Sequence, residues 1–267
     1  MESTIQRPRH EPKAAAAALL AGWTLLAAAL AGGCVNASEY RFITPDTAAA
    51  TGSEVPVVTR LLRAEILGLE SAVKDQPVMI ALVPGDPHAA FTSAKGYASA
   101  TVTLPAESGK YPLTLNYQDL DGVQAAGEGA SWAIDPAAGV LLADLDITER
   151  PADARRLAEL AARLSTRDAT GAPTRVPQVV YAVAAGALKA PEELHRRLAA
   201  AGAPEGPVLS WAIEGGEVVG PLAILAASVQ AIACVPSPDE DFHTLTERLG
   251  LKPCEGWDAG ESEKETP

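Results

Sequence analysis

Hydrophobic positions in the first half of the chain follow two different periods. Apolar residues recur at helical spacing over residues 58–73, which predicts a first amphipathic helix. A continuous apolar run over residues 78–83 predicts a short buried strand. Over residues 97–104 and 113–117, apolar and polar side chains alternate, which predicts a hairpin with one solvent-exposed face. This half of the chain therefore favours an antiparallel sheet.

The second half of the chain alternates between apolar runs and amphipathic segments. Strands are predicted over residues 140–147, 179–183, 208–213 and 218–235. Helices are predicted from Pro151 onward, over residues 191–201 and over residues 237–249, the last with Ser237 in a capping box. The order strand, helix, strand in the middle of this half permits a parallel pair.

A pentapeptide nearly recurs in the two halves. Ser131-Trp132-Ala133-Ile134-Asp135 and Ser210-Trp211-Ala212-Ile213-Glu214 each lead into a turn and then an apolar run. This recurrence raises the alternative of two duplicated strand–hairpin–helix halves. Trp132 and Trp211 would then form a paired aromatic platform for a binding partner, or each would anchor its half in the core.

These patterns predict an α+β fold in one compact domain, with a mostly antiparallel sheet and a few amphipathic helices. The globular domain is expected over residues 55–254. Residues 34–54 are polar and small and predict a flexible tether, and residues 255–267 are acidic and predict a disordered tail.

The first 33 residues have the order of a secretory signal peptide. Arg7, Arg9 and Lys13 precede an apolar run over residues 14–31, and two glycines then lead to Cys34. This segment resembles the lipobox of bacterial lipoproteins, although Ala31 stands where that family usually has a branched aliphatic residue. The resemblance implies cleavage before Cys34 and attachment of fatty acyl chains such as palmitate to its thiol.

Two other outcomes of the leader stay open. Ordinary cleavage after Ala31 would release a secreted protein, and an uncleaved run would remain as a membrane anchor. The lipoprotein resemblance implies a periplasmic-facing location in the cell envelope. Because Val35 rather than aspartate follows the cysteine, it implies the outer membrane rather than the inner one.

The chain has three cysteines, an odd number for an oxidising compartment. Acylation of Cys34 would leave Cys234 and Cys254 as a pair. A disulfide between them would stabilise the folded protein by about 3 kcal/mol, because closing that loop lowers the entropy of the unfolded chain. We therefore predict this disulfide in the exported protein.

The formal net charge of −13 at pH 7 argues against nucleic acid as a partner. The expected partners are the membrane, through the lipid anchor, and an envelope or secreted protein. No cofactor is expected.

Two pairs of aspartates are candidates for chemistry. Asp119 and Asp121 resemble the first motif of haloacid-dehalogenase-type phosphatases, in which a nucleophilic and an acidic aspartate end a buried strand. Their flanking residues alternate and no helix pattern follows, so a hairpin turn is the favoured interpretation. Asp144 and Asp146 lie on one face of a predicted strand, where they could share a divalent cation or a proton. A third ligand would require Asp135 to come round its turn, and a solvated face is favoured.

Other nucleophiles and ligands are weaker. Ser131 lies between small residues, but Pro136 forbids the helix that a nucleophile elbow needs. His88, His195 and His243 have no metal-ligand spacing, and we expect them on the surface.

The sequence therefore predicts a non-catalytic cell-envelope lipoprotein that acts as a protein-binding or scaffold module. The alternative is an exported hydrolase that uses Asp144 and Asp146, with or without a divalent metal. In a hydrolase these aspartates should converge with other polar groups in a pocket, whereas in a scaffold they should line an open face.

Overall fold

The computed structural model describes residues 40–65, 69–167, 170, 173–187, 191–229, 232–235 and 237–252. These residues belong to the compact unit Tyr40–Pro267. The predicted signal peptide, Cys34, Cys254 and the acidic tail lie outside them. Cys234 ends a strand, but its side chain is not described, so its disulfide with Cys254 stays a prediction.

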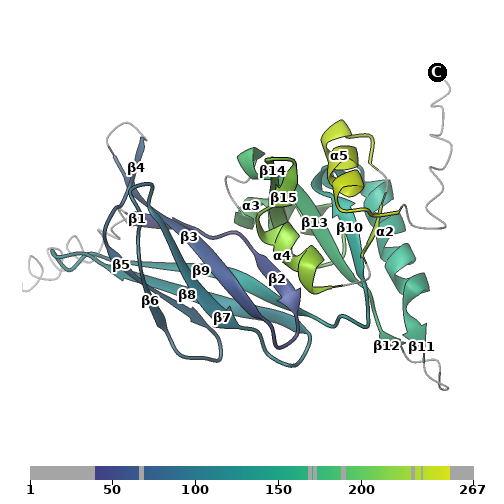
Figure 1. The fold of residues 1–267 in the computed structure, drawn as a ribbon, viewed down its shortest axis with the longest axis horizontal. Coiled ribbons are helices and arrows are strands. Elements are labelled where there is room, and N and C mark those ends of the chain that lie inside the picture. Colours follow the sequence, from purple (N-terminus) through teal and green to yellow (C-terminus); the bar gives the residue numbers. More distant parts are fainter. Residues whose placement is uncertain are drawn as a thin grey trace, which may run out of the picture. The chain divides into compact units, whose positions relative to one another are not determined.

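The first part of the described chain is a sandwich of two sheets (Figure 1). In one sheet, β3 (Glu54–Ala64) pairs antiparallel with β1 (Tyr40–Ile43), β4 (Glu70–Ala72) and β7 (Tyr97–Thr103). The other sheet has the order β2 (Thr47–Ala50), β9 (Gln124–Ile134), β8 (Gly109–Gln118), β5 (Pro77–Leu82) and β6 (His88–Phe91). In this second sheet only β2 and β9 run parallel.

The core of the sandwich is made by side chains at alternate positions of its strands. Val55, Val57 and Leu61 of β3 are buried, and they belong to one cluster with Ile80 of β5 and Leu115 of β8. Because successive side chains of a strand leave opposite faces, this alternation buries one face of each sheet.

The second part of the chain contains a mostly parallel sheet. Its order is β15 (Glu217–Val219), β14 (Val208–Glu214), β13 (Gln178–Ala184), β10 (Val140–Asp144) and β16 (Ile232–Cys234). Only β15 is antiparallel, in a hairpin with β14. The remaining elements of this part are η2 (Leu145–Glu149), α2 (Pro151–Leu164), β11 (Thr166–Arg167), β12 (Pro173–Arg175), η3 (Ala185–Ala187), α3 (Pro191–Ala200), α4 (Pro221–Ser228) and α5 (Glu240–Arg248).

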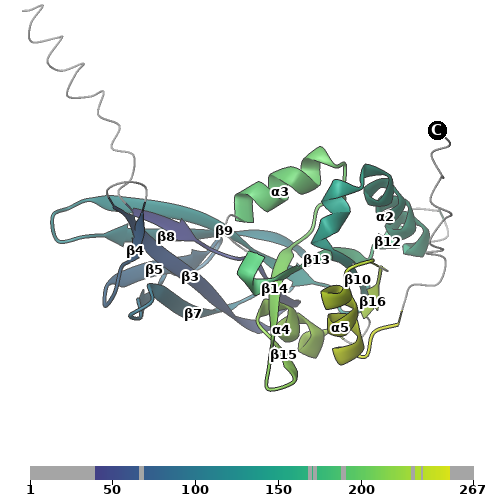
Figure 2. The same ribbon diagram turned by 90° about the horizontal axis from the view of Figure 1, so that it is seen from above.

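Helices cover both faces of the parallel sheet (Figure 2). Leu141 and Ala143 of β10 share a buried cluster with residues of α2 and α3, whereas Val140 and Leu142 share another with residues of α4 and α5. A parallel strand covered in this way is apolar on both faces, which explains the continuous apolar run of β10. The helix after β10 and the helix after β16 therefore lie on opposite faces of the sheet, although the two strands are neighbours.

That arrangement creates a topological switch point between β10 and β16. In open α/β sheets, ligands bind outside the carboxyl ends of the strands at such a point. The carboxyl end of β10 is Asp144.

The predicted α+β class with mostly antiparallel strands is confirmed, but several local predictions are wrong. Residues 54–64 form β3 instead of the amphipathic helix predicted over 58–73, because Val55, Val57, Thr59 and Leu61 alternate inward and β-branched residues favour strands. The two strands of the predicted hairpin exist, but β7 pairs with β3 while β8 pairs with β5 and β9.

The tether predicted over residues 34–54 is also corrected where the structure describes it. Residues 40–43 and 47–50 form β1 and β2. Buried Thr47 shares a hydrogen bond of 2.8 Å with Ser131 of β9, so this polar segment is satisfied inside the fold. Small and polar composition here reflects close packing rather than flexibility.

The structure does not make the two pentapeptides equivalent. Ser131 and Trp132 lie in β9 of the sandwich, whereas Ser210 and Trp211 lie in β14 of the parallel sheet. The apolar run over residues 218–235 is not one strand, because Gly220 has a φ of 99° and Pro221 starts α4. The cap of α5 is Asp239 rather than Ser237.

Trp132 and Trp211 belong to one buried cluster that joins the sandwich to the parallel sheet. They are 4% and 8% exposed, and Ala48 and Ala50 of β2 belong to the same cluster. These exposures contradict an open aromatic platform and fit core anchors.

Gly206 provides a test of how closely β13 and the loop before β14 approach. An added Cβ would overlap the carbonyl oxygen of Val179, and neither backbone can yield easily. Gly206→Ala is expected to lower the free energy of unfolding by about 1–3 kcal/mol, measured by urea denaturation. Gly186→Ala, which meets no atom within 4 Å, is the matched control and is expected to change it by less than about 0.5 kcal/mol. Equal effects of the two substitutions would contradict this account.

Candidate functional site

Asp144 ends β10 and is 8% exposed. Asp144 is the N-cap of η2, and its Oδ1 accepts a hydrogen bond from the backbone N–H of Asp146 at 3.2 Å. Its Oδ2 accepts from the hydroxyl of buried Ser237 at 2.5 Å, after β16. The carboxylate is therefore fixed by both strands that flank the switch point.

Three carboxylates converge at this edge of the sheet. Ligand oxygens of Asp144, Asp146 and Asp239 all lie within 4.8 Å of one another. Asp239 is positioned as the N-cap of α5, where it accepts from the backbone N–H of Asp241 at 2.9 Å. Oxygen ligands from several carboxylates suit Mg²⁺ or Ca²⁺. The trio fits a hard divalent cation in ligand type and spacing.

Asp239, and not Asp135, is the third carboxylate. Asp135 lies in the turn between β9 and β10, where it accepts from the backbone N–H of Ala137 at 2.9 Å. The sequence did not indicate Asp239, because the apolar run before it was predicted as one strand and instead contains α4 and β16. The pattern of a strand followed at once by an acidic helix cap is the signal that could have identified it.

These aspartates line a cavity of about 190 Å³, which we call the acid pocket. Its residues come from the carboxyl ends of β10 and β13, from η2, from the middle of β14, and from α3 and α5 with its cap. Its polar side includes Asp144, Asp146, Asp239 and Asp241, and its apolar wall includes Val183, Leu194, Trp211 and Phe242. The predicted pair, Asp144 and Asp146, thus lines a pocket instead of an open face.

The electrostatics of the acid pocket favour a proton or a cation. Burial is the largest cause that raises the pKa of Asp146, and the charges of Asp144, Glu149 and Asp239 raise it further. Arg150 opposes this shift. Among the lining residues the only cationic side chain is Arg197 of α3, which pairs with Glu149 at 3.3 Å.

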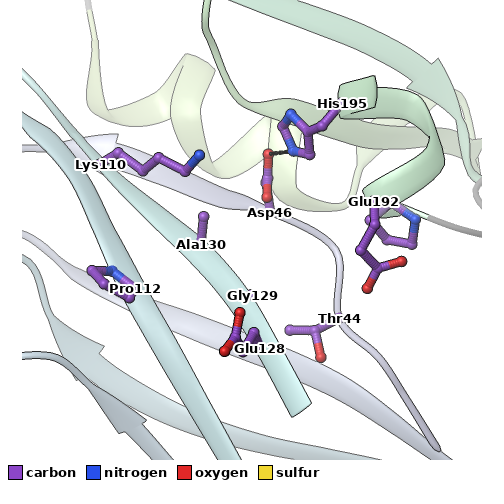
Figure 3. Close-up of a pocket in the computed structure, with 10 residues that line it drawn as sticks. Thr44, Asp46, Lys110, Pro112, Glu128, Gly129, Ala130, Glu192 and His195 are labelled. Atoms are coloured by element: carbon purple, nitrogen blue, oxygen red, sulfur yellow. Dashed lines mark hydrogen bonds and ion pairs between the residues drawn. The ribbon is translucent and has the colours of Figure 1, made fainter. Parts of the chain in front are cut away.

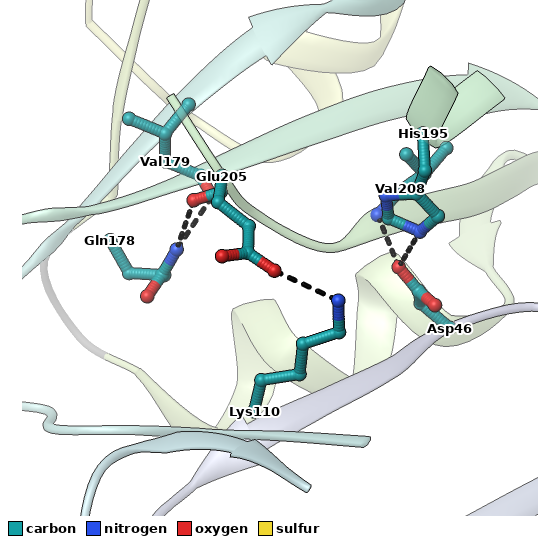
Figure 4. Close-up of polar contacts among 7 residues, drawn as sticks. All are labelled: Asp46, Lys110, Gln178, Val179, His195, Glu205 and Val208. Atoms are coloured by element: carbon teal, nitrogen blue, oxygen red, sulfur yellow. Dashed lines mark hydrogen bonds and ion pairs between the residues drawn. The ribbon is translucent and has the colours of Figure 1, made fainter. Parts of the chain in front are cut away.

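A second polar cluster lies where the β1–β2 connection meets α3 (Figure 3). Asp46 is 4% exposed, and its Oδ2 accepts hydrogen bonds from His195 Nε2 at 2.8 Å and from the backbone N–H of Val208 at 2.9 Å (Figure 4). The hydrogen bond to Asp46 is the largest cause that raises the pKa of His195. The cluster borders a cavity of about 410 Å³ whose lining includes Lys110, Glu128 and Glu192.

Sequence reasoning missed this second cluster. Asp46 falls in the predicted tether, and His195 was expected on the surface. Its side chain is only 29% exposed, so that expectation is wrong. Asp46 and His195 lie far apart in the chain, so no local spacing indicates their contact.

The other aspartate pair is a turn, as expected. Asp119 Oδ1 accepts from the backbone N–H groups of Asp121 at 2.9 Å and Val123 at 2.8 Å, at the end of the β8–β9 hairpin. The condition attached to the phosphatase motif, two aspartates after a buried strand and before a helix, is met instead by Asp144 and Asp146.

Comparisons with known proteins leave the function open. No family profile matches the chain, and neither does any curated protein. Similar solved structures include the D00-D0 domain of intimin, with 18% identity over 39% of this chain and 51% of that one and a TM-score of 0.28. A carbohydrate acetylesterase from Xanthomonas citri has 14% identity over 71% of this chain and 33% of that one, with a TM-score of 0.28. Invasin, described as a bacterial integrin-binding protein, has 13% identity over 38% and 21%, with a TM-score of 0.27.

These likenesses are too distant to carry an argument about function, and the chain spans about half or less of each of those structures. Among the described residues, no helix combines the length and apolar character needed to cross a bilayer.

The raised pKa of Asp146 gives a pH-dependent prediction. A folded-state pKa above the ordinary 3.8 means that the contribution of Asp146 to stability is fully present below pH 3.8 and is lost as the pH rises through the folded-state pKa. Asp146→Asn removes the penalised charge. We expect it to raise Tm at pH 8 and to have less effect at pH 4, measured by calorimetry without divalent ions. Asp121→Asn, in the exposed hairpin, should change Tm equally little at both pH values, and an equal gain for Asp146→Asn at both would contradict this electrostatic account.

Proposed function

We propose that the α/β part of this protein is a divalent-cation-dependent hydrolase that acts on a phosphate ester. The observation that carries the proposal is the position of Asp144 and Asp146. They follow a buried central strand at a topological switch point and converge with Asp239 in the acid pocket. This convergence supports the hydrolase over a scaffold with an open acidic face.

In this proposal Asp144 is the nucleophile. One of its carboxylate oxygens attacks phosphorus, and the bond from phosphorus to the ester oxygen breaks. Asp146 gives its proton to the leaving oxygen, and the raised pKa of Asp146 suits that role. Water then attacks the aspartyl phosphate, Asp146 takes a proton from that water, and phosphate leaves while the Asp144 carboxylate is restored.

Asp144 and Asp239 would hold the cation, and the Asp146 carboxyl beside them would keep its proton for the leaving group. A bound divalent cation supplies positive charge that offsets the repulsion between these carboxylates and the phosphate oxygens. The protein contributes the fixed orientation of Asp144, through its hydrogen bonds with Ser237 and the Asp146 N–H.

The test uses p-nitrophenyl phosphate as substrate and Mg²⁺ as cation. We expect Mg²⁺-dependent release of phosphate, and Asp144→Asn should lower kcat by about 10³-fold or more because it removes the nucleophile. The matched control is Asp121→Asn, which alters the other aspartate pair and should leave kcat within about twofold. Absence of hydrolysis by the unmodified protein, or full activity of Asp144→Asn, would reject the proposal.

We also propose that the protein is an exported lipoprotein of the cell envelope, periplasmic-facing and anchored through Cys34 in the outer membrane. The order of charge, apolar run and small residues in the leader supports this. The intact mass of the protein isolated from its native membrane should correspond to a chain that begins at Cys34, with acyl chains added and two hydrogens lost to a Cys234–Cys254 disulfide. A mass that includes Met1 and three reduced thiols would contradict it.

The non-catalytic binding or scaffold role remains a prediction from the sequence. We also propose an envelope or secreted protein as its partner. No contact among the described residues specifies that protein.

A further inference from the structure

We propose that Asp46 and His195 form an anchor through which the sandwich holds α3 in place at the acid pocket, so that both are positioning residues for the site. The inference rests on the proposed hydrolase function. Neither residue lines the acid pocket, and neither was expected from the sequence to take part in the site.

The anchor is centred on a buried carboxylate. Asp46 belongs to the connection between β1 and β2, and a single carboxylate oxygen accepts from both His195 and Val208. Burying a carboxylate is costly unless it is paired and hydrogen-bonded, and removing one partner leaves that cost unopposed. The position of α3 relative to the sandwich is therefore tightly specified.

Both elements that contact Asp46 also supply walls of the acid pocket. His195 lies on α3 beside Leu194 and two residues before Arg197, and both of these line the pocket. Residues two positions apart point to different sides of a helix, so α3 can contact the sandwich through one side and the pocket through another. Val208 begins β14, whose Trp211 is part of the apolar wall.

The consequence for chemistry falls on the phosphate rather than on the cation. Arg197 is the one cationic side chain among the pocket-lining residues, and a guanidinium can contact two phosphate oxygens at once. The proposed cation ligands come from β10 and from the cap of α5, not from α3. A shift of α3 should therefore weaken phosphate binding while cation binding is retained.

The anchor should also make phosphate binding depend on pH. The charged groups around His195 are Asp46, Lys110 and Glu205, with Glu128 across the adjoining cavity and Glu192 and Arg196 on α3 itself. Because the pKa of His195 is raised, the stabilising charge is fully present below pH 6.5 and is lost as the pH rises through the folded-state pKa. Affinity for phosphate should fall over the same range.

The experiment compares the unmodified protein with three variants by calorimetry, with Mg²⁺ alone and with inorganic phosphate in saturating Mg²⁺. His195→Ala removes the donor to Asp46, and His195→Gln keeps a donor without the titrating charge. Arg196→Gln alters an exposed pair with Glu193 on the same helix and is the control. Hydrogen exchange of the α3 amides and circular dichroism accompany each measurement.

We expect His195→Ala to weaken phosphate affinity by about tenfold and to speed exchange in α3, with Mg²⁺ affinity unchanged. His195→Gln should bind phosphate with intermediate affinity and lose the fall in affinity between pH 6 and 8. Arg196→Gln should behave as the unmodified protein does. If His195→Ala fails to fold, His195→Gln decides the question through its pH profile.

Two negative results are distinguishable. If the unmodified protein binds neither Mg²⁺ nor phosphate, the proposed function fails and the inference falls with it. If the unmodified protein binds both and the His195 variants match it in phosphate affinity, pH profile and α3 exchange, the function stands and the anchor is rejected. Parallel loss of Mg²⁺ and phosphate binding in a folded His195 variant would also reject the anchor, because it would show a general effect on the site.

Discussion

The burial of β10 on both faces is the constraint on which the rest of the α/β part depends. A parallel strand has no solvent face, so α2 and α3 must cover one side and α4 and α5 the other. After the neighbouring strands β10 and β16, the chain therefore continues on opposite faces of the sheet. A crevice lies where these two strands end. Asp144 stands at that point because it is the first polar residue after the buried run.

The acid pocket and the sandwich are joined by the same packing. Trp132 and Ile134 of β9 belong to a buried cluster with Leu142 of β10 and Trp211 of β14, so the two parts share one apolar core. The buried Asp46 contact adds a directional interaction to this non-directional one. Apolar contact brings the parts together, and the hydrogen bonds of Asp46 specify how α3 and β14 lie against the β1–β2 connection.

Elements with a strong local pattern were predictable from the sequence. The helix that starts at Pro151, the strands at residues 179–183 and 208–213, and the parallel pair around α3 all follow from periodicity and caps. The β3 segment was mistaken for a helix because its apolar residues fit both periods, and only pairing with β1 and β7 decides between them. The sequence indicated Asp144 and Asp146 as candidate carboxylates, but spacing along the chain could not indicate Asp239.

What the sequence by itself determined is local: an apolar strand that ends in two alternating aspartates, amphipathic helices with recognisable caps, and a leader with the order of an export signal. Only the tertiary structure decided which residues meet. Asp239 joins Asp144 and Asp146, and Asp46 meets His195, because strand order and helix placement bring distant segments to one sheet edge and one helix. Local periodicity specifies which face of an element is buried but not which element covers it, and functional sites depend on the latter.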